Sequence, residues 1–549
     1  MFKFTQFFST KTTPQREPIP GTAQVPNSAG GHAWGLDDWG RLDRFLILGS
    51  EGGTFYIAER KLTIDNATVV SRCLSHDGVR TVDRIVAISE AGRAPKNDPA
   101  IFALAMAAKL GDDATRRAAY AALPRVCRIG THLMHFADYA QGFGGWGRGM
   151  RTAVAAWFNR KPADELAFQL AKYQSRDGWS SRDLLRLAHP RAASPSHDRL
   201  FAWAVTGALP AGAADDPAVA LIAAIEQLQQ LDAATDVAAA VNLIREHRMP
   251  RECVPTQWLR SPEIWDALLA AMPMTAMIRN LAAMTRVGLV TAGSAAAGQV
   301  AAQLRDAQRL GKARVHPIGV LAALTTYRAG RGVRGQARWQ PVASVVDALD
   351  AAFYASFGAV QSSGKRTLLA LDVSGSMEGG EVGGVPNLSP RIASAAMALV
   401  TAATEPDHAF LAFTAGSAGR AGGKWGGGPS GVTVLSISPR QRLDDVVQTV
   451  QRLPMGGTDC ALPMRWAQQH GVDVDTFCIY TDNETWAGDV HPAQALRGYR
   501  DARGIPAKLV VVGMTSTGFT IADPDDAGMI DVVGFDASTP PVIADFARA

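Results

Sequence analysis

Five oxygen-bearing side chains in the last third of the chain stand in three short motifs that could together hold a divalent metal ion. Asp372-Val-Ser374-Gly-Ser376 follows a run of aliphatic residues, so its first, third and fifth side chains can converge on one point. Thr458, in a Gly-Gly-Thr-Asp motif, would add a third hydroxyl, and Asp482, in Tyr-Thr-Asp-Asn, a second carboxylate. Hard oxygen ligands of this kind favour Mg²⁺, or Mn²⁺, with water in the remaining octahedral positions.

The elements around these motifs predict how the side chains are positioned. After residue 364 aliphatic strands alternate with helices, as in the strands 365–375 and 476–482 and the helix 390–404. Such alternation is typical of a doubly wound, Rossmann-like α/β sheet, in which ligands bind at the carboxyl ends of the strands. Both aspartates follow such ends. A turn with Asp and Ser capping a helix would explain the first motif alone, but not three motifs at three strand–helix junctions.

The chain before residue 365 is different in character. Residues 1–31 are rich in Pro, Thr, Ser and Gly and predict a flexible N-terminal arm. Residues 32–364 contain many short amphipathic segments, such as 98–112 and 261–273, with Asp, Ser or Thr near their starts. A long series of such helices favours a repeat domain of stacked helix pairs, with an irregular helical bundle as the alternative. We therefore expect three regions, 1–31, 32–364 and 365–549.

Charge separates the two main regions. Residues 1–364 hold 41 Lys and Arg against 31 Asp and Glu, whereas residues 365–549 hold 14 against 20. A polyanion should therefore favour the first region. Cations concentrate in 148–191 and 303–339, where aromatic residues are interspersed, and this combination suits phosphate contacts and the stacking of unpaired bases. The alternative is a solvated basic face with its aromatics packed in the core. The candidate RNA-binding residues are Arg148, Arg151, Lys172, Arg176, Arg182, Arg186 and His189.

Among these candidates, Lys172 with Arg176 and Arg182 with Arg186 are two pairs whose members are four residues apart. The members of each pair would share one face of a helix.

The five cysteines are scattered without a paired motif, which argues against disulfides and fits a reducing compartment. We find no signal peptide and no apolar run long enough to span a membrane, and we expect a cytoplasmic protein. No nucleophile–base set or phosphate-binding loop accompanies the metal motif, so we assign no catalytic residue.

Seven segments from about Trp34 to the end of the chain are distinctive. They read RFLILGSEGGTFYI, LPRVCRIGTHL, YQSRDGWSSRDLLRLAHP, ARVHPIGVLAALTTYRAGRGVRG, GGTDCALPMRWAQ, YTDNETWAG and GFTIADPDDAGMIDVVGFD. These blocks resemble the Ro autoantigen family, which joins a TROVE domain to a von Willebrand A domain. The metal motif likewise resembles the metal-ion-dependent adhesion site (MIDAS) of von Willebrand A domains.

The resemblance implies a monomeric ring of HEAT-like helical repeats that the von Willebrand A domain closes. It implies binding of Y RNA on the outer surface and of single-stranded 3′ ends of misfolded or precursor non-coding RNA in the central hole. Bacterial members act beside exoribonucleases such as polynucleotide phosphorylase, in RNA quality control, processing or decay and in the stress response. By position, Lys172, Arg176, Arg182, Arg186 and His189 lie in the segment that resembles the family's RNA-binding surface.

One departure from the family concerns this surface. Vertebrate relatives read Trp-Ser-His-Lys-Asp where this chain has Trp-Ser-Ser181-Arg182-Asp, so a contact of that histidine is either lost or supplied by Arg182. The leading hypothesis is a non-catalytic RNA-binding protein. The alternative is a metal-dependent adhesion or scaffold protein that binds an acidic protein partner. A metal-dependent hydrolase is disfavoured, because a single metal without a nearby base is a poor hydrolytic centre.

Overall fold

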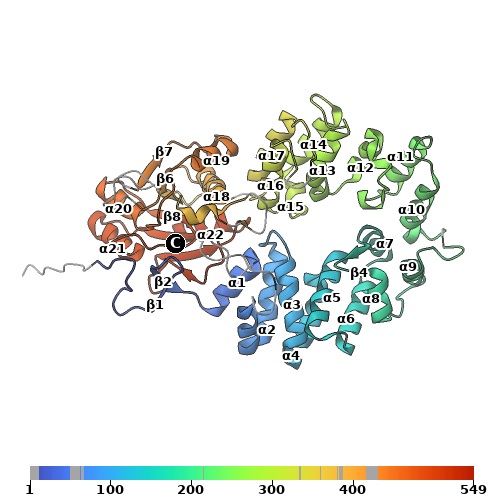
Figure 1. The fold of residues 1–549 in the computed structure, drawn as a ribbon, viewed down its shortest axis with the longest axis horizontal. Coiled ribbons are helices and arrows are strands. Elements are labelled where there is room, and N and C mark those ends of the chain that lie inside the picture. The colour runs from blue at the N-terminus through green and yellow to red at the C-terminus, as the bar shows by residue number, and fades with distance from the viewer. Residues whose placement is uncertain are drawn as a thin grey trace, which may run out of the picture. The chain divides into compact units, whose positions relative to one another are not determined.

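The computed structural model describes residues 12–49, 62, 67–213, 215–332, 336–358, 360–379, 381–382, 388–415 and 431–549. The chain divides into two compact units (Figure 1). The α/β unit consists of Met1–Lys61 and Ala359–Ala549, and the helical unit consists of Leu62–Gly358. The predicted boundary between 364 and 365 lies close to the second transition. Residues 32–49, which we placed in the helical domain, belong instead to the α/β unit.

The helical unit contains only short helices in its described part, apart from the kinked α2, whose backbone leaves the helical region at Asp77. The helices are α2 (Thr68–Ala91), α3 (Asp98–Leu110), α4 (Asp113–Val126), α5 (Gly130–Gly144), α6 (Arg148–Arg160), α7 (Ala163–Lys172), α8 (Ser181–Ala188), α9 (Pro195–Thr206), α10 (Ala220–Gln230), α11 (Val237–Glu246), α12 (Pro262–Ala271), α13 (Met274–Arg286), α14 (Ala295–Arg305), α15 (Ala307–Lys312), α16 (Pro317–Arg328) and α17 (Ala343–Ala355).

Side-chain caps and small residues explain how these helices begin and pack. The side chains of Asp112, Ser194, Ser261 and Ser294 each accept a hydrogen bond from a backbone N–H in the first turn of the helix that follows. Helix α3 is buried over 99–108, and its alanines let α2, α4 and α5 approach it closely. The stacked helices of the predicted repeat domain are confirmed.

The helical unit also returns to its own beginning. The Arg314 guanidinium, just before α16, donates to the carbonyl oxygen of Glu90 at the end of α2, at 3.3 Å. The ring nitrogen Nε2 of His316 lies 3.1 Å from the carbonyl oxygen of Arg93. The last part of the helical series therefore contacts the first helix of the same unit.

The α/β unit is built on a six-stranded sheet of order β11-β9-β8-β5-β6-β7. Its strands are β5 (Thr367–Asp372), β6 (His408–Phe413), β7 (Val432–Leu435), β8 (Thr476–Thr481), β9 (Lys508–Gly513) and β11 (Met529–Val533). All neighbours are parallel except β6 and β7, which are antiparallel. The predicted parallel sheet is thus confirmed at its centre, and β7 is an antiparallel edge strand.

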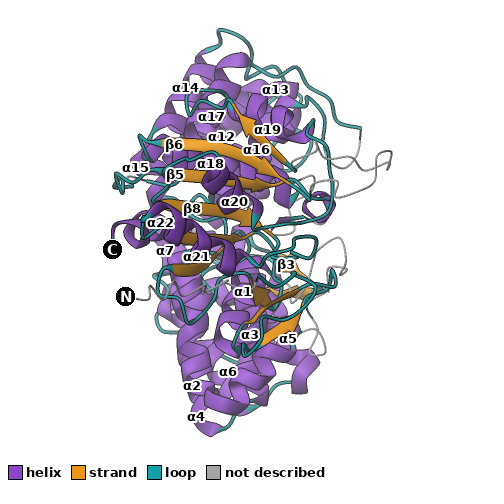
Figure 2. Cartoon of the chain, turned by 90° about the vertical axis from the view of Figure 1, so that its left-hand side faces the viewer, coloured by secondary structure: helices purple, strands orange, loops and turns teal. Residues whose placement is uncertain are grey.

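Helices cover both faces of this sheet (Figure 2). The helices of this unit are α1 (Asp38–Leu48), α18 (Pro390–Thr404), α19 (Leu443–Gln451), α20 (Leu462–Gln469), α21 (Pro492–Arg503) and α22 (Thr539–Arg548). One face packs Leu368, Phe477 and Leu509 against α20 and α21 in a single apolar cluster. The other face packs against α18, where the hydroxyls of Thr401 and Tyr480 lie 3.0 Å apart. Burial on both sides explains the aliphatic runs of the central strands.

The start of the described chain is packed, unlike the flexible arm that we predicted over 1–31. Residues 12–31 belong to the α/β unit, and residues 1–11 of the predicted arm lie outside the described residues. Strands β1 (Gln24–Pro26) and β2 (His32–Gly35) form a small antiparallel sheet with β10 (Phe519–Thr520). Ile19 joins the apolar cluster, and Gln15 is fully buried. Contacts with residues far along the chain order this segment.

The cysteines all lie in the described residues and are buried and unpaired, which confirms that they form no disulfide framework. Burial raises the pKa of the Cys253 thiol to about 12, because the apolar surroundings disfavour the thiolate. Of the helices in the described part, none is both long and apolar enough to cross a membrane.

Candidate functional site

The five predicted metal ligands come together at the carboxyl ends of the central strands β5 and β8. Asp372 is the last residue of β5, and Asp482 follows the last residue of β8. Ser374 and Ser376 lie in the turn after β5, and Thr458 lies in the loop between α19 and α20. Parallel neighbours in a sheet end at the same edge, which is why residues more than a hundred positions apart meet here.

Hydrogen bonds fix the orientation of Asp372 and the two serines. One carboxylate oxygen of Asp372 accepts from the backbone N–H of Ser374 at 2.9 Å, and the other accepts from the Thr481 hydroxyl at 2.7 Å. The hydroxyl oxygens of Ser374 and Ser376 lie 3.1 Å apart. Exposure is 1% or less for Asp372, both serines, Thr458 and Asp482. A set of oxygens therefore faces a protected point.

Two oxygen atoms of this set lack the hydrogen-bond partner that a buried polar atom normally has. Thr458 Oγ1 and Asp482 Oδ2 are buried and have no hydrogen-bond partner among the described residues. Buried polar atoms are rarely left without a partner. A bound cation would provide the partner that these two oxygens lack. No group of three or more His, Cys, Asp and Glu side chains suited to a metal occurs in the described part. Any metal here would thus depend on hydroxyl ligands as well as the two carboxylates.

The electrostatics of the two carboxylates point the same way. Burial raises the pKa of the Asp372 carboxyl. Burial, with the nearby charge of Asp372, raises the pKa of Asp482 to about 8. Two carboxylates at one buried point repel each other, and a divalent cation between them would remove that penalty. Chemically, the arrangement suits a Lewis-acidic cation that retains water or accepts an oxygen from a partner.

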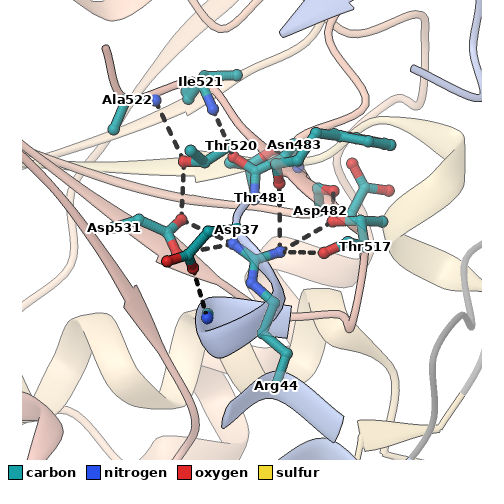
Figure 3. Close-up of polar contacts among 12 residues, drawn as sticks. Asp37, Arg44, Thr481, Asp482, Asn483, Thr517, Thr520, Ile521, Ala522 and Asp531 are labelled. Carbon is teal, nitrogen blue, oxygen red and sulfur yellow. Dashed lines mark hydrogen bonds and ion pairs between the residues drawn. The ribbon is translucent and has the colours of Figure 1, made fainter. Parts of the chain in front are cut away.

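The backbone of the Asp482 loop is held by a network that the sequence did not predict (Figure 3). The Thr517 hydroxyl donates to the Asp482 carbonyl oxygen at 3.2 Å, and the Arg44 guanidinium donates to the Thr517 carbonyl at 2.7 Å. Arg44 also pairs with both carboxylate oxygens of Asp531, at 2.7 and 2.8 Å. More than 470 positions separate Arg44 from Thr517, so no local pattern could have linked them.

A second candidate site, in the helical unit, is a basic pocket between the start of α6 and the end of α8. Its volume is about 530 Å³, and of the described residues that line it none is acidic. The lining residues are Trp146, Arg148, Arg151, Thr152, Ala155, Ala188, His189, Pro190 and Arg191. The pocket therefore brings together three of the predicted RNA-binding residues.

Local backbone structure places these side chains. Helix α6 begins after Gly147, which offers no side-chain cap, so the free N–H groups of its first turn favour an anion. His189 ends α8 in a left-handed conformation with φ of 46°, and its N–H donates to the Leu185 carbonyl at 2.9 Å. The indole N–H of Trp146 is buried without a partner among the described residues, and its ring lies 5.7 Å from that of Trp179.

The other predicted RNA-binding residues lie outside this pocket. Arg182 and Arg186 are exposed on α8, and their shared helix is confirmed. The helical pairing of Lys172 with Arg176 is wrong, because α7 ends at Lys172 and Arg176 lies in a hairpin. This hairpin consists of β3 (Ser175–Arg176) and β4 (Trp179–Ser180).

Lys172 has different surroundings. Its ammonium lies 5.4 Å from the ring centre of Phe168 and 5.5 Å from that of Tyr173. It lines a separate pocket of about 370 Å³ whose wall also contains Arg248 and Glu252.

Two aromatic residues of the second basic stretch, Tyr327 and Trp339, are hydrogen-bonded to each other. The Trp339 indole N–H donates to the Tyr327 carbonyl oxygen at 2.8 Å. Tyr327 is buried, as the alternative of core-packed aromatics predicts.

Comparison with known proteins gives consistent matches over both units. The family model of the TROVE domain matches residues 25–326, and the model of the Ro60 von Willebrand A domain matches residues 366–547. The chain is 44% identical over 527 residues to the RNA-binding protein RO60 of Deinococcus radiodurans, covering 96% of this chain and 95% of that protein. It is 36% identical over 609 residues to RNA-binding protein RO60 of Caenorhabditis elegans, covering 98% and 92%.

A solved structure supports the same relationship. The crystal structure of the Deinococcus radiodurans RO (RSR) protein matches with a TM-score of 0.69 and 43% sequence identity. The match covers 93% of this chain and 99% of that one. The combination of a helical-repeat unit with a von Willebrand A unit, predicted from the sequence, is confirmed.

Proposed function

The chain belongs to the Ro60 family, and from this premise we propose that it is a non-catalytic RNA-binding protein. The observation that carries the proposal is the basic pocket of the helical unit. Arg148, Arg151 and Arg191 supply guanidinium groups that can contact phosphates in pairs of hydrogen bonds. Trp146 offers an aromatic wall on which a base can stack, and His189 adds a ring nitrogen beside it.

We further propose two kinds of RNA ligand. A Y RNA would bind the outer surface around the basic pocket and the exposed face of α8. The single-stranded 3′ end of a misfolded or precursor RNA would enter a central hole, and an exoribonuclease such as polynucleotide phosphorylase would act on it. Support for a ring comes from the contacts of Arg314 and His316 with the end of α2. The proposed protein is a cytoplasmic monomer.

Filter binding with matched arginine variants tests this proposal. Arg148→Ala/Arg151→Ala should weaken binding of a Y-like RNA at least about tenfold at moderate salt, because charge-assisted hydrogen bonds contribute about 1.5–3 kcal/mol each. The slope of log affinity against log salt should fall by about 2. Arg160→Ala, exposed at the other end of α6, is the control and should bind as the wild type does. Unchanged affinity of the double variant would reject this pocket, and Arg182→Ala/Arg186→Ala would then test the α8 face.

We also propose that Asp372, Ser374, Ser376, Thr458 and Asp482 hold a divalent cation, Mg²⁺ or Mn²⁺. The unpartnered oxygens of Thr458 and Asp482 support it. When bound, the cation would supply a Lewis-acidic position able to accept a carboxylate or phosphate oxygen. Mn²⁺ titration followed by electron paramagnetic resonance should show one site that Asp482→Ala removes. Asp489→Ala, an exposed aspartate of the same loop, is the matched control.

The cation site favours a second candidate function, docking of an acidic protein partner. The chain's own oxygens would hold the cation on one side, and a partner carboxylate would complete its coordination. Pull-downs with and without a chelator separate the two functions. Loss of a protein partner with retention of RNA would support docking at the cation site, whereas loss of RNA would tie the cation to RNA binding. Degradation of labelled RNA by the purified protein with Mn²⁺ would contradict a non-catalytic role.

A further inference from the structure

The first described residues of the chain form a strap across the candidate cation site. We define the N-terminal strap as residues 12–35, which include β1 and β2. Gln15 is fully buried, with an exposed fraction of 0%. Its backbone N–H donates to the Gly488 carbonyl at 2.9 Å, and its carbonyl accepts from the His32 N–H at 2.8 Å. The Gln15 backbone is therefore fixed within the unit.

The side-chain amide of Gln15 bonds to two loops, the one that carries Thr458 and the one that carries Asp482. Its Nε2 donates to Asp459 Oδ1 at 2.6 Å, and Asp459 directly follows the ligand Thr458. Its Oε1 accepts from the Thr485 hydroxyl at 2.6 Å, and Thr485 lies three residues after the ligand Asp482. Additional bonds to the Val490 carbonyl and from the Gly488 N–H, at 2.8 and 3.3 Å, use the remaining capacity of the amide.

The two loops also bond to each other beside Gln15. The backbone N–H groups of Trp486 and Ala487 donate to the Thr458 carbonyl at 3.1 and 3.0 Å, and the Cys460 N–H donates to the Thr485 hydroxyl at 3.1 Å. The packing leaves no room for a side chain at Gly488, where an added methyl carbon would lie 2.4 Å from Asp459 Oδ1 and from Gln15 Nε2. Gln15 thus fills the junction between the loops.

Three other strap residues contact the loop after Asp482. The Asn27 side-chain amide donates to the Thr485 carbonyl at 2.6 Å, and the Ala29 N–H donates to a carboxylate oxygen of Glu484 at 3.0 Å. The Arg16 guanidinium lies 4.9 Å from the ring centre of Trp486. Gln15 differs from these residues because its side chain reaches both loops.

We propose that Gln15 is a positioning residue for the cation site. It fixes the distance between the two ligands Thr458 and Asp482. The inference rests on the proposed cation site. Mg²⁺ demands near-ideal octahedral geometry at about 2.0–2.1 Å, so ligands on two loops must be held at one spacing. Residues that orient metal ligands typically change metal affinity about 10- to 100-fold when they are replaced. Through Gln15, occupancy of the site is coupled to order in the N-terminal strap.

Titration of the full-length protein with Mn²⁺, followed by electron paramagnetic resonance, tests the proposal. Gln15→Leu keeps the size of the side chain but removes its hydrogen bonds, and should raise the Kd for Mn²⁺ about 10- to 100-fold. Glu17→Ala, an exposed position of the same strap, should leave the Kd unchanged. A merely structural role would lower the melting temperature in chelator and leave the Kd of Gln15→Leu equal to that of the wild type, which would overturn the inference. Absence of Mn²⁺ binding by the wild type would instead overturn the cation site itself.

A second measurement uses the wild type and is independent of how well Gln15→Leu folds. Coupling between two sites is reciprocal, so a cation that gains affinity from the strap must also stabilise it. Saturating Mg²⁺ should slow hydrogen exchange of the Gln15 and His32 amides in the wild type, and not in Asp482→Ala. Equal exchange rates with and without Mg²⁺, in a protein shown to bind Mg²⁺, would overturn the inference.

Discussion

Arg44 is a buried guanidinium in the α/β unit, and its replacement by leucine tests how helix α1 stabilises that unit. Its side chain is 2% exposed and that of its partner Asp531 is 17% exposed, so solvent can replace little of what is lost. Besides the paired carboxylate, it donates to the carbonyl oxygen of Thr517 at 2.7 Å (Figure 3). It also donates to the carbonyl oxygen of Phe519 at 3.3 Å. With leucine at position 44, the charged Asp531 would lose its ion pair and keep the hydrogen bond from the Thr520 hydroxyl, at 2.8 Å.

The magnitude follows from the loss of one member of a buried ion pair. Removal of one partner leaves an uncompensated charge and costs about 3–5 kcal/mol. We therefore expect the free energy of unfolding of the α/β unit to fall by about 4 kcal/mol in Arg44→Leu. Arg44→Leu/Asp531→Leu should recover about 2 kcal/mol of this loss, because it removes the stranded carboxylate as well.

Hydrogen exchange of the β9 and β11 amides in the full-length protein measures this change within the α/β unit. Arg41→Leu is the control, since Arg41 lies on the same helix and is only half-buried, and it should cost less than about 1 kcal/mol. A loss below about 1 kcal/mol in Arg44→Leu would refute the reasoning. A double variant as unstable as the single one would show that the stranded charge is not the cause.

Two further predictions concern the candidate sites. In the metal-free protein the pKa of Asp482 is raised from 3.8 to about 8, so the folded state binds a proton that the unfolded chain releases. The free energy of unfolding should therefore fall as pH rises from about 4 to 8, by up to about 1.4 kcal/mol per pH unit, and saturating Mg²⁺ or Asp482→Asn should flatten this profile. Denaturation at several pH values measures the profile. A free energy of unfolding that increased with pH in the metal-free protein would contradict the prediction. At the basic pocket, His189→Gly should stabilise the end of α8 by about 0.5–1 kcal/mol, because glycine adopts positive φ without strain. The same variant should weaken RNA binding in a filter assay, and wild-type affinity would show that the imidazole is not used.

The centre of the α/β unit was predictable from the sequence because burial on both faces leaves a plain signal. Helix α18 has the bounds 390–404 that the periodicity predicts, and the strands 476–481 and 508–513 lie within their aliphatic runs. The meeting of the five candidate ligands at the sheet edge followed from the rule that parallel strands end together. At the edges the sequence was less informative: the direction of β7 was missed, because its alternating pattern suits either orientation, and the edge strand β11 was not predicted.

The contacts of the N-terminal strap could not have been predicted in this way. Gln15 meets Asp459 and Thr485 across more than 440 positions, and β2 pairs with β10 across a similar distance. A proline-rich segment without an apolar pattern carries no local sign of such partners. The hairpin that separates Lys172 from Arg176, in contrast, did carry a signal. Asp177-Gly178, with φ of 50° and 79°, is the dipeptide typical of a tight hairpin turn.

Crosslinking of the protein to RNA in its own cell, with sequencing of the RNA and mapping of the crosslinked peptides, tests the proposed function most directly. We expect small structured RNAs of the Y type, crosslinked to peptides that carry Trp146 or His189 of the basic pocket. Recovery of no RNA above background, or crosslinks confined to the α/β unit, would contradict RNA binding by the helical unit.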